Sequence, residues 1–358
     1  MDKQLIAGLQ IRIANIDDQH IWDAYALSHP LATPYHKFAW VQTVEEAYLH
    51  KSVSLIATIN QQVVGLLPCV KMQNPVGKII FCSLPFCDLG FVLADNQDIA
   101  TAIKQHAVLI MQEAGGRAFE YRDSQSTSAT QQDIAITDPW IKVRMVLPLP
   151  ASADALMDGF KSKLRSQIRK SEKNGLTCNI GQSAQSVADF YAIFAKNMRK
   201  LGSPVHSQYW FQCLIKNYAE DVYLAIVYKQ TIPVGAGLII KNGDKVAIPW
   251  ASTDADYNHL APNMMLYWSL LKQACELGCQ QFDFGRSTYG EGTFKFKQQW
   301  GAEPVPLLWS DLQAGPSETS VTPGHTSHLR KLVEGIWSRL PLGVTTSLGP
   351  KIRKHISL

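Results

Sequence analysis

The chain has 358 residues, of which 46% are hydrophobic and 18% are charged. This length exceeds what one ordinary core holds, so two domains are expected, and the composition excludes an intrinsically disordered chain. The formal net charge of +4 is too small to indicate nucleic-acid binding by itself, although it suits a phosphate-bearing substrate.

The sequence gives no sign of membrane insertion or of secretion. No run of about 18 apolar residues predicts a spanning helix, and the first residues lack the basic and apolar regions of a signal peptide. The seven cysteines contain no Cys-x-x-Cys pair, and the ten histidines form no metal-ligand pattern. We therefore expect a cytoplasmic protein with reduced, buried thiols and no metal site.

The first half of the chain alternates short apolar strands with helices. We expect strands at residues 9–16, 53–59, 63–71, 78–84, 118–121 and 140–147, and helices at 18–28, 34–48 and 99–114. The polar turn Asn60-Gln61-Gln62 is typical of a hairpin. Asp88 is the one acid in the apolar loop 85–90. Burial there would raise its pKa and suit it to act as a general base, whereas the alternative interpretation is a turn-capping aspartate.

The second half repeats this order at a nearly constant offset. Pro204-Val205-His206 matches Pro34-Tyr35-His36, Tyr218 matches Tyr48, and Phe282-Asp283 matches Phe119-Glu120. A repeat of this size indicates two copies of one α/β domain rather than a solenoid. We expect domains at residues 1–150 and 151–314, followed by a linker and tail at 315–358.

A basic helix is predicted at the start of the second domain, from Ala153 to Asn174. Apolar residues at every fourth position predict its buried face. A second row with the same spacing is basic: Lys161, Arg165, Arg169 and Lys173. This row is either a solvated face or a cradle for phosphates or anionic carbohydrate.

The tail joins an apolar face to a basic surface. Residues 315–326 are rich in Pro, Ser, Thr and Gly and read as a linker, and the segment from 328 to 358 combines apolar helical spacing with six lysines and arginines. Such a segment suits the surface of an anionic membrane, or it docks back on the core.

The segment 281–307 is the strongest candidate for a site. A strand ends at Asp283 and Arg286, a glycine-punctuated turn follows, and a short helix then carries Lys295 and Lys297. In open α/β sheets, ligands bind at this edge of the strands.

Several segments together resemble the Fem-type family, which comprises peptidoglycan aminoacyltransferases and relatives associated with exosortase (PEP-CTERM) exopolysaccharide systems. The matching segments are residues 164–176, 202–207, 250–257, 262–268 and 281–307, with 84–90 in the first half and 337–342 and 348–350 in the tail. The resemblance implies two tandem acetyltransferase-like (GNAT) domains, mixed α/β in class, and transfer of an acyl or aminoacyl group to an amine. It also places Lys297, which follows Phe296, against the acyl donor or the developing charge. The long helical arm of some members has no counterpart here.

Further residues are candidates for binding or proton transfer. Asp283 would orient Arg286 or accept the amine proton, or else pair structurally, and Arg286 would clamp a carboxylate or phosphate. Tyr257 and Asn263 would bind the acceptor or cap a helix. His206 would contact ligand, or it is a hydrogen-bonded histidine at a helix entrance.

The donor is left open between two classes. Acetyltransferases of this superfamily hold the coenzyme A pyrophosphate with Arg/Gln-x-x-Gly-x-Gly/Ala at a helix start. Here Arg286-x3-Gly290-x-Gly292 is one residue too long. This favours aminoacyl-tRNA or another carrier over acyl-CoA, with no tightly bound cofactor.

We therefore expect a cytoplasmic N-acyl- or N-aminoacyltransferase that acts on an anionic sugar-nucleotide or lipid-linked envelope precursor. It would be free in the cytoplasm or peripherally bound to the inner membrane, and it would not bind DNA. The alternatives are a non-catalytic binding or assembly protein of an exopolysaccharide system and an acyl-CoA-dependent N-acetyltransferase.

Overall fold

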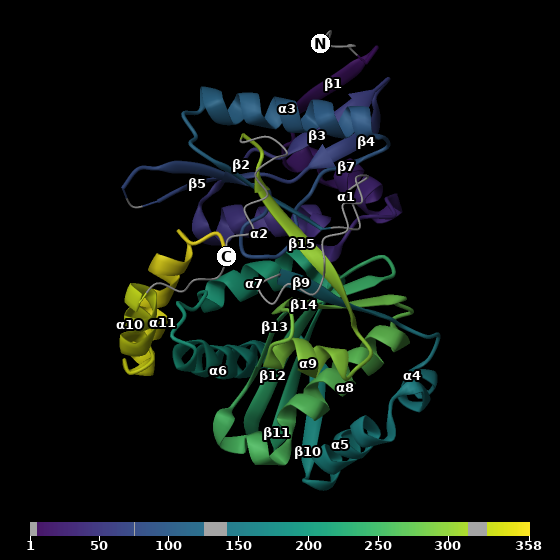
Figure 1. Ribbon diagram of the computed structural model, residues 1–358, viewed down its shortest axis with the longest axis vertical. Helices are drawn as coiled ribbons and strands as arrows, with labels where there is room; N and C mark the ends of the chain where they lie inside the picture. Colours follow the sequence, from purple (N-terminus) through teal and green to yellow (C-terminus); the bar gives the residue numbers. More distant parts are fainter. Residues whose placement is uncertain (1–5, 75, 125–141, 314–327) are drawn as a thin grey trace. The chain divides into compact units, whose positions relative to one another are not determined.

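The computed structural model describes residues 6–74, 76–124, 142–313 and 328–358, which form two compact units (Figure 1). The first unit comprises Met1–Ala135, Pro306–Thr322 and His355–Leu358, and the second comprises Ile136–Val305 and Pro323–Lys354. The predicted mixed α/β class is confirmed. The predicted linker at 315–326 lies outside the described residues.

In the first unit, two runs of paired strands are accompanied by three helices. The strand orders are β1-β3-β4-β7 and β15-β8-β6-β5-β2. The strands are β1 (Leu9–Ile13), β2 (Lys51–Ser52), β3 (Leu55–Ile59), β4 (Gln62–Leu67), β5 (Val70–Gln73), β6 (Ile79–Cys82), β7 (Leu93–Ala94), β8 (Phe119–Ser124) and β15 (Glu303–Asp311). The helices are α1 (Gln19–Ser28), α2 (Phe38–Tyr48) and α3 (Gln97–Glu113), with 3-10 turns η1 (Ile16–Asp18) and η2 (Pro34–His36).

The second unit is built on one sheet with the order β10-β11-β12-β13-β14-β9. Its strands are β9 (Lys142–Pro148), β10 (Leu176–Gly181), β11 (Val222–Lys229), β12 (Ile232–Asn242), β13 (Lys245–Thr253) and β14 (Gln281–Thr288). Its helices are α4 (Ala153–Gly159), α5 (Ser162–Lys173), α6 (Ala184–Lys200), α7 (Gln208–Tyr218), α8 (Pro262–Glu276), α9 (Gly292–Gln298), α10 (His328–Trp337) and α11 (Leu342–Arg353), with 3-10 turns η4 (Ala219–Asp221) and η5 (Ala255–Leu260).

Both units follow the same plan, as the internal repeat predicts. The second unit has the strand order β10-β11-β12-β13-β14-β9. The first unit has the same order in two runs, β1-β3-β4 and β5-β6-β8-β15, in which the consecutive strands β4 and β5 together take the place of β12. Pro68 lies between β4 and β5, where its missing N–H cannot join a ladder. In each unit a central pair is parallel, β6 with β8 and β13 with β14.

The boundaries of the units differ from the expected domain ends at 150 and 314. Strand β9 belongs to the second unit and pairs with β14, while the part of β15 from Pro306 onward belongs to the first unit and pairs with β8. Each unit therefore completes its sheet with a strand from a distant part of the sequence. The pattern of an isolated strand does not reveal which edge it will join.

The predicted basic helix from Ala153 to Asn174 is two helices instead of one. Helix α4 ends at Gly159, and α5 begins at Ser162, because Phe160 and Lys161 are extended. The Phe160 ring packs edge-on against Trp268 and Trp300, and this contact holds the backbone out of the helix. The break removes Lys161 from the basic row, so the row on α5 begins at Arg165.

The tail forms two helices that dock on the second unit. Helix α11 packs against α6, and Thr345 and Gly349 are buried on its inner face. A Cβ at Gly349 would lie 2.8 Å from Val205 Cγ1, so glycine permits the close approach. In the part of the chain that the structure describes, none of the helices is both long and apolar enough to span a bilayer.

Candidate functional site

The central feature of the second unit is a split between two parallel strands. Strands β13 and β14 pair only over three positions, from Lys245↔Gln281 to Ala247↔Asp283. On their other edges, β13 pairs with β12 and β14 pairs with β9, both before and beyond this point. Within the described residues, the ladder between the two facing edges ends at Ala247 and Asp283. The backbone groups there that the chain does not itself occupy can pair with an extended ligand, whereas the N–H of Gly285 and the carbonyls of Gly285 and Arg286 are already bonded.

Lys297 stands at β14 where the split opens. Its Nζ donates to the carbonyl oxygens of Gly285, at 3.0 Å, and of Arg286, at 2.8 Å. The side chain comes from the short helix α9 and is buried, whereas its neighbour Lys295 on the same helix is exposed. Lys297 is thus an enclosed ammonium fixed by two backbone groups, and its predicted contact with the acyl donor stays a prediction.

Asp283 pairs with Arg144 rather than with Arg286. The distance from Asp283 Oδ2 to Arg144 Nη2 is 2.9 Å, and both side chains are buried. Asp283 Oδ1 also accepts from the backbone N–H of Gly285, whose φ of +70° belongs to a bulge in β14. The structural pairing considered above is the arrangement that the structure shows, and the role of Asp283 as a proton acceptor stays a prediction.

Basic side chains from two strands gather at the far end of β14. Arg286 lies opposite Arg144 in the ladder, and Thr288 lies opposite Lys142, whose Nζ donates to Thr288 Oγ1 at 2.6 Å. Arg144 Nε has no hydrogen-bond partner among the described residues. Asp283 balances Arg144, whereas Lys142 and Arg286 add two further positive charges on adjacent strands, so this end of the sheet suits a negatively charged ligand.

The sequence analysis missed Lys142 and Arg144. The available signal was their alternation, with cations at every second position of an otherwise apolar strand, which places both on one face. That strand was expected in the first domain, far from Lys297. Its pairing with β14 could not be read from local pattern.

Aromatic rings pack around the helix that carries Lys297. Phe296 is half-buried, and its ring meets the Tyr267 ring edge-on with 5.0 Å between the ring centroids. Tyr267 in turn stacks on Phe284, with 5.6 Å between the centroids. Burial raises the pKa of Tyr267 well above its ordinary value, so it stays a neutral phenol. Phe296 therefore fixes α9 on the sheet, and its predicted contact with a ligand stays a prediction.

The loop between β13 and α8 carries two other predicted residues. Tyr257 lies in η5 and Asn263 in the first turn of α8, both half-buried. The same loop holds Asp254 and Asp256, both bonded to Lys196 Nζ. The structure places Tyr257 before α8 and Asn263 in its first turn, and their predicted roles stay predictions.

The predicted basic residues of α5 face outward. Arg169 is exposed, and Arg165 Nη1 donates to the Asp158 carbonyl at 3.1 Å. The helix itself packs on α8 and β10 through Leu164 and Ile168. This geometry matches the solvated face that was one of the two interpretations, and the cradle for anions stays a prediction.

His206 is covered by the tail. It is 1% exposed, stacks on Trp210 and accepts a hydrogen bond at Nε2 from Arg353 Nε at 3.1 Å. Burial, aided by the Arg353 charge, holds the pKa of His206 well below 6.5. The hydrogen-bonded histidine is therefore the interpretation that the structure supports, and its burial argues against direct ligand contact.

The buried His206 predicts a stability that falls in acid. The unfolded chain binds a proton near the ordinary pKa of 6.5, whereas the folded imidazole stays neutral to lower pH. The unfolded state then binds more protons, so stability is full above 6.5 and decreases as the pH falls below it, by up to about 1.4 kcal/mol per pH unit. Urea unfolding between pH 7.5 and pH 5 should show a steeper loss for the parent than for His206→Gln; equal slopes would contradict this origin.

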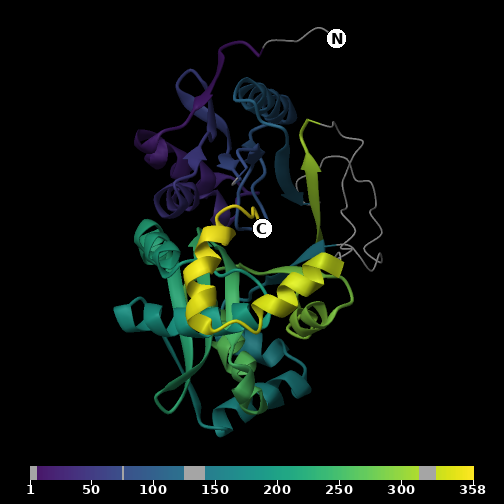
Figure 2. The same ribbon diagram turned by 90° about the vertical axis from the view of Figure 1, so that its left-hand side faces the viewer.

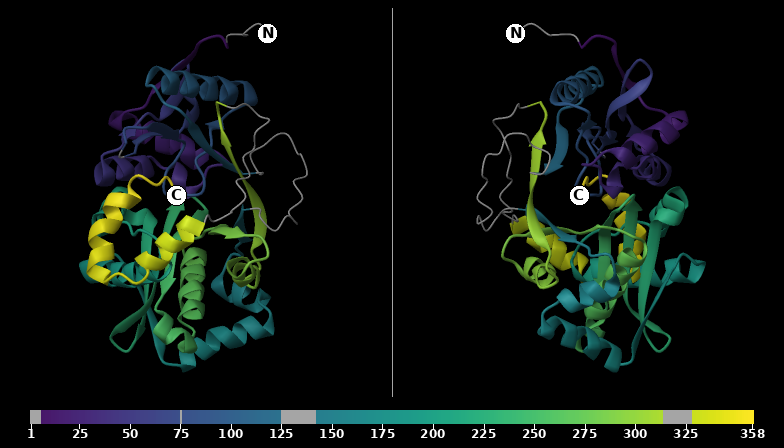
Figure 3. Two further views of the ribbon diagram at one scale, coloured as in Figure 1. Left: turned by 60° about the vertical axis from the view of Figure 1, so that its left-hand side comes forward. Right: turned by 90° about the vertical axis from the view of Figure 1, so that its right-hand side faces the viewer.

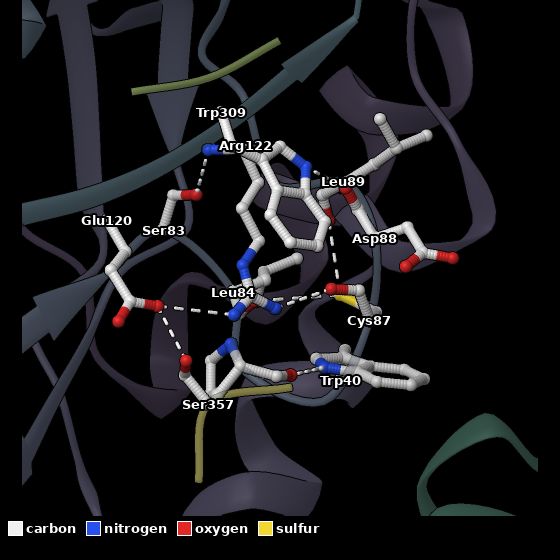
Figure 4. Close-up of polar contacts among 11 residues, drawn as sticks. Trp40, Ser83, Leu84, Cys87, Asp88, Leu89, Glu120, Arg122, Trp309 and Ser357 are labelled. Carbon is white, nitrogen blue, oxygen red and sulfur yellow. Dashed lines mark hydrogen bonds and ion pairs between the residues drawn. The ribbon is translucent and has the colours of Figure 1, made fainter. Parts of the chain in front are cut away.

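The corresponding place in the first unit is filled by the unit's own side chains (Figure 4). Arg122 is 2% exposed, and its Nη1 donates to the carbonyls of Leu84 at 2.8 Å and Cys87 at 2.5 Å. The Trp309 ring covers the guanidinium, and Glu120 pairs with its Nη2. These contacts tie the loop after β6 to β8, so among the described residues Arg122 occupies the position that corresponds to the split of the second unit.

Asp88 belongs to this loop and differs from its expected environment. Its side chain is half-buried rather than enclosed by apolar groups, and its backbone carbonyl accepts from Trp309 Nε1 at 3.0 Å (Figure 4). Burial by itself would lower the pKa of Arg122, but the neighbouring Cys82, Cys87 and Glu120, with a smaller effect from Asp88, raise it overall. Asp88 is therefore less enclosed than expected, although its neighbours Phe86, Cys87 and Leu89 are buried. Its catalytic role stays a prediction.

Comparisons with known proteins agree with this fold. Residues 159–298 match the family described as an acetyltransferase (GNAT) domain. The chain is similar to the crystal structure of FemX, with a TM-score of 0.66 and 15% identity over 83% of this chain and 94% of that one. It is also similar to a tandem GNAT protein from the clavulanic acid biosynthesis pathway, with a TM-score of 0.52 and 13% identity over 87% and 100% of the two chains.

A further similar structure is L-PGS from Bacillus licheniformis, with a TM-score of 0.52 and 10% identity over 96% of this chain and 98% of that one. No curated protein sequence matched. At these identities the structural similarities show the fold alone: the chain has the fold of the tandem GNAT proteins, and the family match lies within its second unit.

Proposed function

We propose that this protein is an N-acyl- or N-aminoacyltransferase that modifies an amine on a peptidoglycan or exopolysaccharide precursor. The observation that carries the proposal is the split between β13 and β14 with the Lys297 ammonium at β14 where the split opens. The GNAT domain and the FemX-like fold support acyl transfer as the class of reaction.

The reaction needs few side chains. A neutral amine attacks the donor's carbonyl carbon, an N–C bond forms, and the bond from that carbon to the carrier's sulfur or oxygen breaks. The amine proton leaves with the carrier or passes to solvent. The tetrahedral oxyanion requires preorganised donors. The N–H groups along the split strands and the positive charge of Lys297 supply this chemistry without a nucleophilic residue.

The basic end of β14 supports an anionic acceptor. Lys142 and Arg286 lie on adjacent strands, and the buried Arg144 between them is balanced by Asp283. A phosphate or a carboxylate would be attracted there, and Arg286 offers the planar fork that binds either group. Sugar-nucleotide and lipid-linked envelope precursors carry such groups, which is why we propose them as the acceptor class.

The two donor classes are supported by different features. The GNAT family match favours acyl-CoA. The helix that follows β13 favours a donor other than coenzyme A, because it begins at Pro262, which has no N–H, and follows a loop with Asp254 and Asp256. Pyrophosphate binding at a helix start needs free backbone N–H groups and no competing carboxylates.

A transfer assay tests the function and separates the donors. Purified protein is incubated with amine-bearing sugar nucleotides and either acetyl-CoA or aminoacyl-tRNA, and the acceptor's mass is followed. We expect the mass to increase by one acyl or aminoacyl group with one donor, because the split strands and Lys297 hold a single acyl carbonyl. Tight acceptor binding with no turnover from either donor would instead favour the non-catalytic binding protein.

A further inference from the structure

The two tail helices leave a row of large apolar side chains in solvent. Helices α10 and α11 are the outermost elements on the face of the second unit turned to the viewer in Figure 2, and the left panel of Figure 3 agrees. The exposed residues are Leu332, Val333 and Ile336 on α10 and Val344, Leu348 and Ile352 on α11, between 38% and 62% exposed. Such a concentration of exposed apolar side chains on two consecutive helices marks an interaction surface.

Another face of these two helices is already occupied, about 100° around α11 from its exposed residues. Gly349 packs on Val205, Arg353 bonds to His206, and Arg199 Nη1 donates to the Leu340 carbonyl at 3.4 Å. Trp337 is also buried, at 9% exposure. The exposed apolar residues are therefore not the side of the helices that packs on the second unit. They are exposed on two consecutive helices whose other contacts anchor both helices to the second unit.

Charge indicates what the row would meet. The segment from residue 328 to the last residue contains six lysines and arginines and a single acid, Glu334, a net charge of +5 (6 − 1). Lys351 is exposed beside Leu348 and Ile352 on α11, and Arg339 is exposed between the two helices. An apolar row flanked by cations is the pattern of helices that lie in the interface of an anionic bilayer, with the apolar side chains among the acyl chains.

We propose that the exposed face of α10 and α11 binds the surface of an anionic lipid bilayer, with both helices parallel to the membrane plane. Val344, Leu348 and Ile352 enter the acyl-chain boundary, and Lys351 and Arg339 contact the headgroup phosphates. The inference does not depend on the transfer chemistry, since it concerns a different face of the chain.

Vesicle binding tests this proposal. The full-length protein is mixed with vesicles of phosphatidylcholine alone or with vesicles that also contain about 30 mole per cent phosphatidylglycerol, which supplies the anionic charge. The bound fraction is measured by flotation. We expect binding to the anionic vesicles only, weakened by added salt. The variant Leu348→Ser/Ile352→Ser should bind at least about tenfold more weakly.

A matched control distinguishes binding through this surface from non-specific hydrophobic binding to vesicles. Leu109 on α3 is 50% exposed and lies in the first unit, so Leu109→Ser should leave vesicle binding unchanged. As an independent measurement, Leu348→Trp should gain fluorescence that lipids with brominated acyl chains quench. Equal binding by the Leu348→Ser/Ile352→Ser and Leu109→Ser variants, or no binding to anionic vesicles, would overturn the proposal. A dimer that Leu348→Ser/Ile352→Ser dissolves would overturn it in favour of a second copy of the chain.

Discussion

Replacing Lys297 by methionine is expected to lower kcat by about 10²–10³-fold, the effect typical of removing one oxyanion donor. Methionine keeps the length and packing of the buried stem but removes the ammonium that bonds to the Gly285 and Arg286 carbonyls. Because the charge acts on the developing oxyanion, KM for the donor should change much less than kcat. The measurement is steady-state kinetics with the donor that supports turnover.

Lys295 provides the matched control for this variant. It lies on the same short helix and carries the same charge, but it is exposed. Lys295→Met should retain kcat within about twofold, since exposed charges contribute little. If Lys297→Met keeps the parent's kcat while remaining folded by thermal unfolding, the lysine holds the strand end and plays no part in the transfer.

Replacing Asp283 by alanine is expected to destabilise the second unit by about 3–5 kcal/mol, because it leaves the Arg144 guanidinium buried without its partner. Arg144 already has one unpartnered N–H among the described residues, so its remaining contacts cannot compensate. The free energy of unfolding from urea titration gives the measurement.

The double variant Asp283→Ala/Arg144→Met distinguishes two causes of the lost stability: the broken Asp283–Arg144 ion pair and the space left by the Asp283 side chain. Methionine removes the uncompensated charge while filling much of the arginine's space, so the double variant should recover most of the lost stability. A loss as large in the double variant as in Asp283→Ala would mean that packing at Asp283, rather than the buried ion pair, controls stability here.

Local patterns predicted most elements of the fold. The hairpin of β11 and β12, helix α8 and the end of α3 before Gly115 follow from apolar periodicity and glycine stops. The order of motifs also predicted the tandem plan, because duplicated domains preserve their local signals. The six buried cysteines and the half-buried Cys178 are free thiols, as the composition predicted.

The remainder depends on contacts between distant residues. The break between α4 and α5 follows from Phe160 packing on Trp300, and helix propensity does not include such a contact. The site depends on β9 joining β14, which brings Arg144 to Asp283 and Lys142 to Thr288. Lys297 could be predicted from its family-like position after Phe296, but its burial and its carbonyl partners required the fold.

Amide hydrogen exchange with and without the donor tests most directly whether the split between β13 and β14 is the binding site. A donor that lies along the split must pair with strand backbone, so protection should increase over residues 248–253 of β13 and 284–288 of β14. Strands β6 and β8 of the first unit should show no change, because Arg122 closes that position. Protection of β6 and β8 instead, with β13 and β14 unaffected, would contradict the assignment of the second unit as the transfer site.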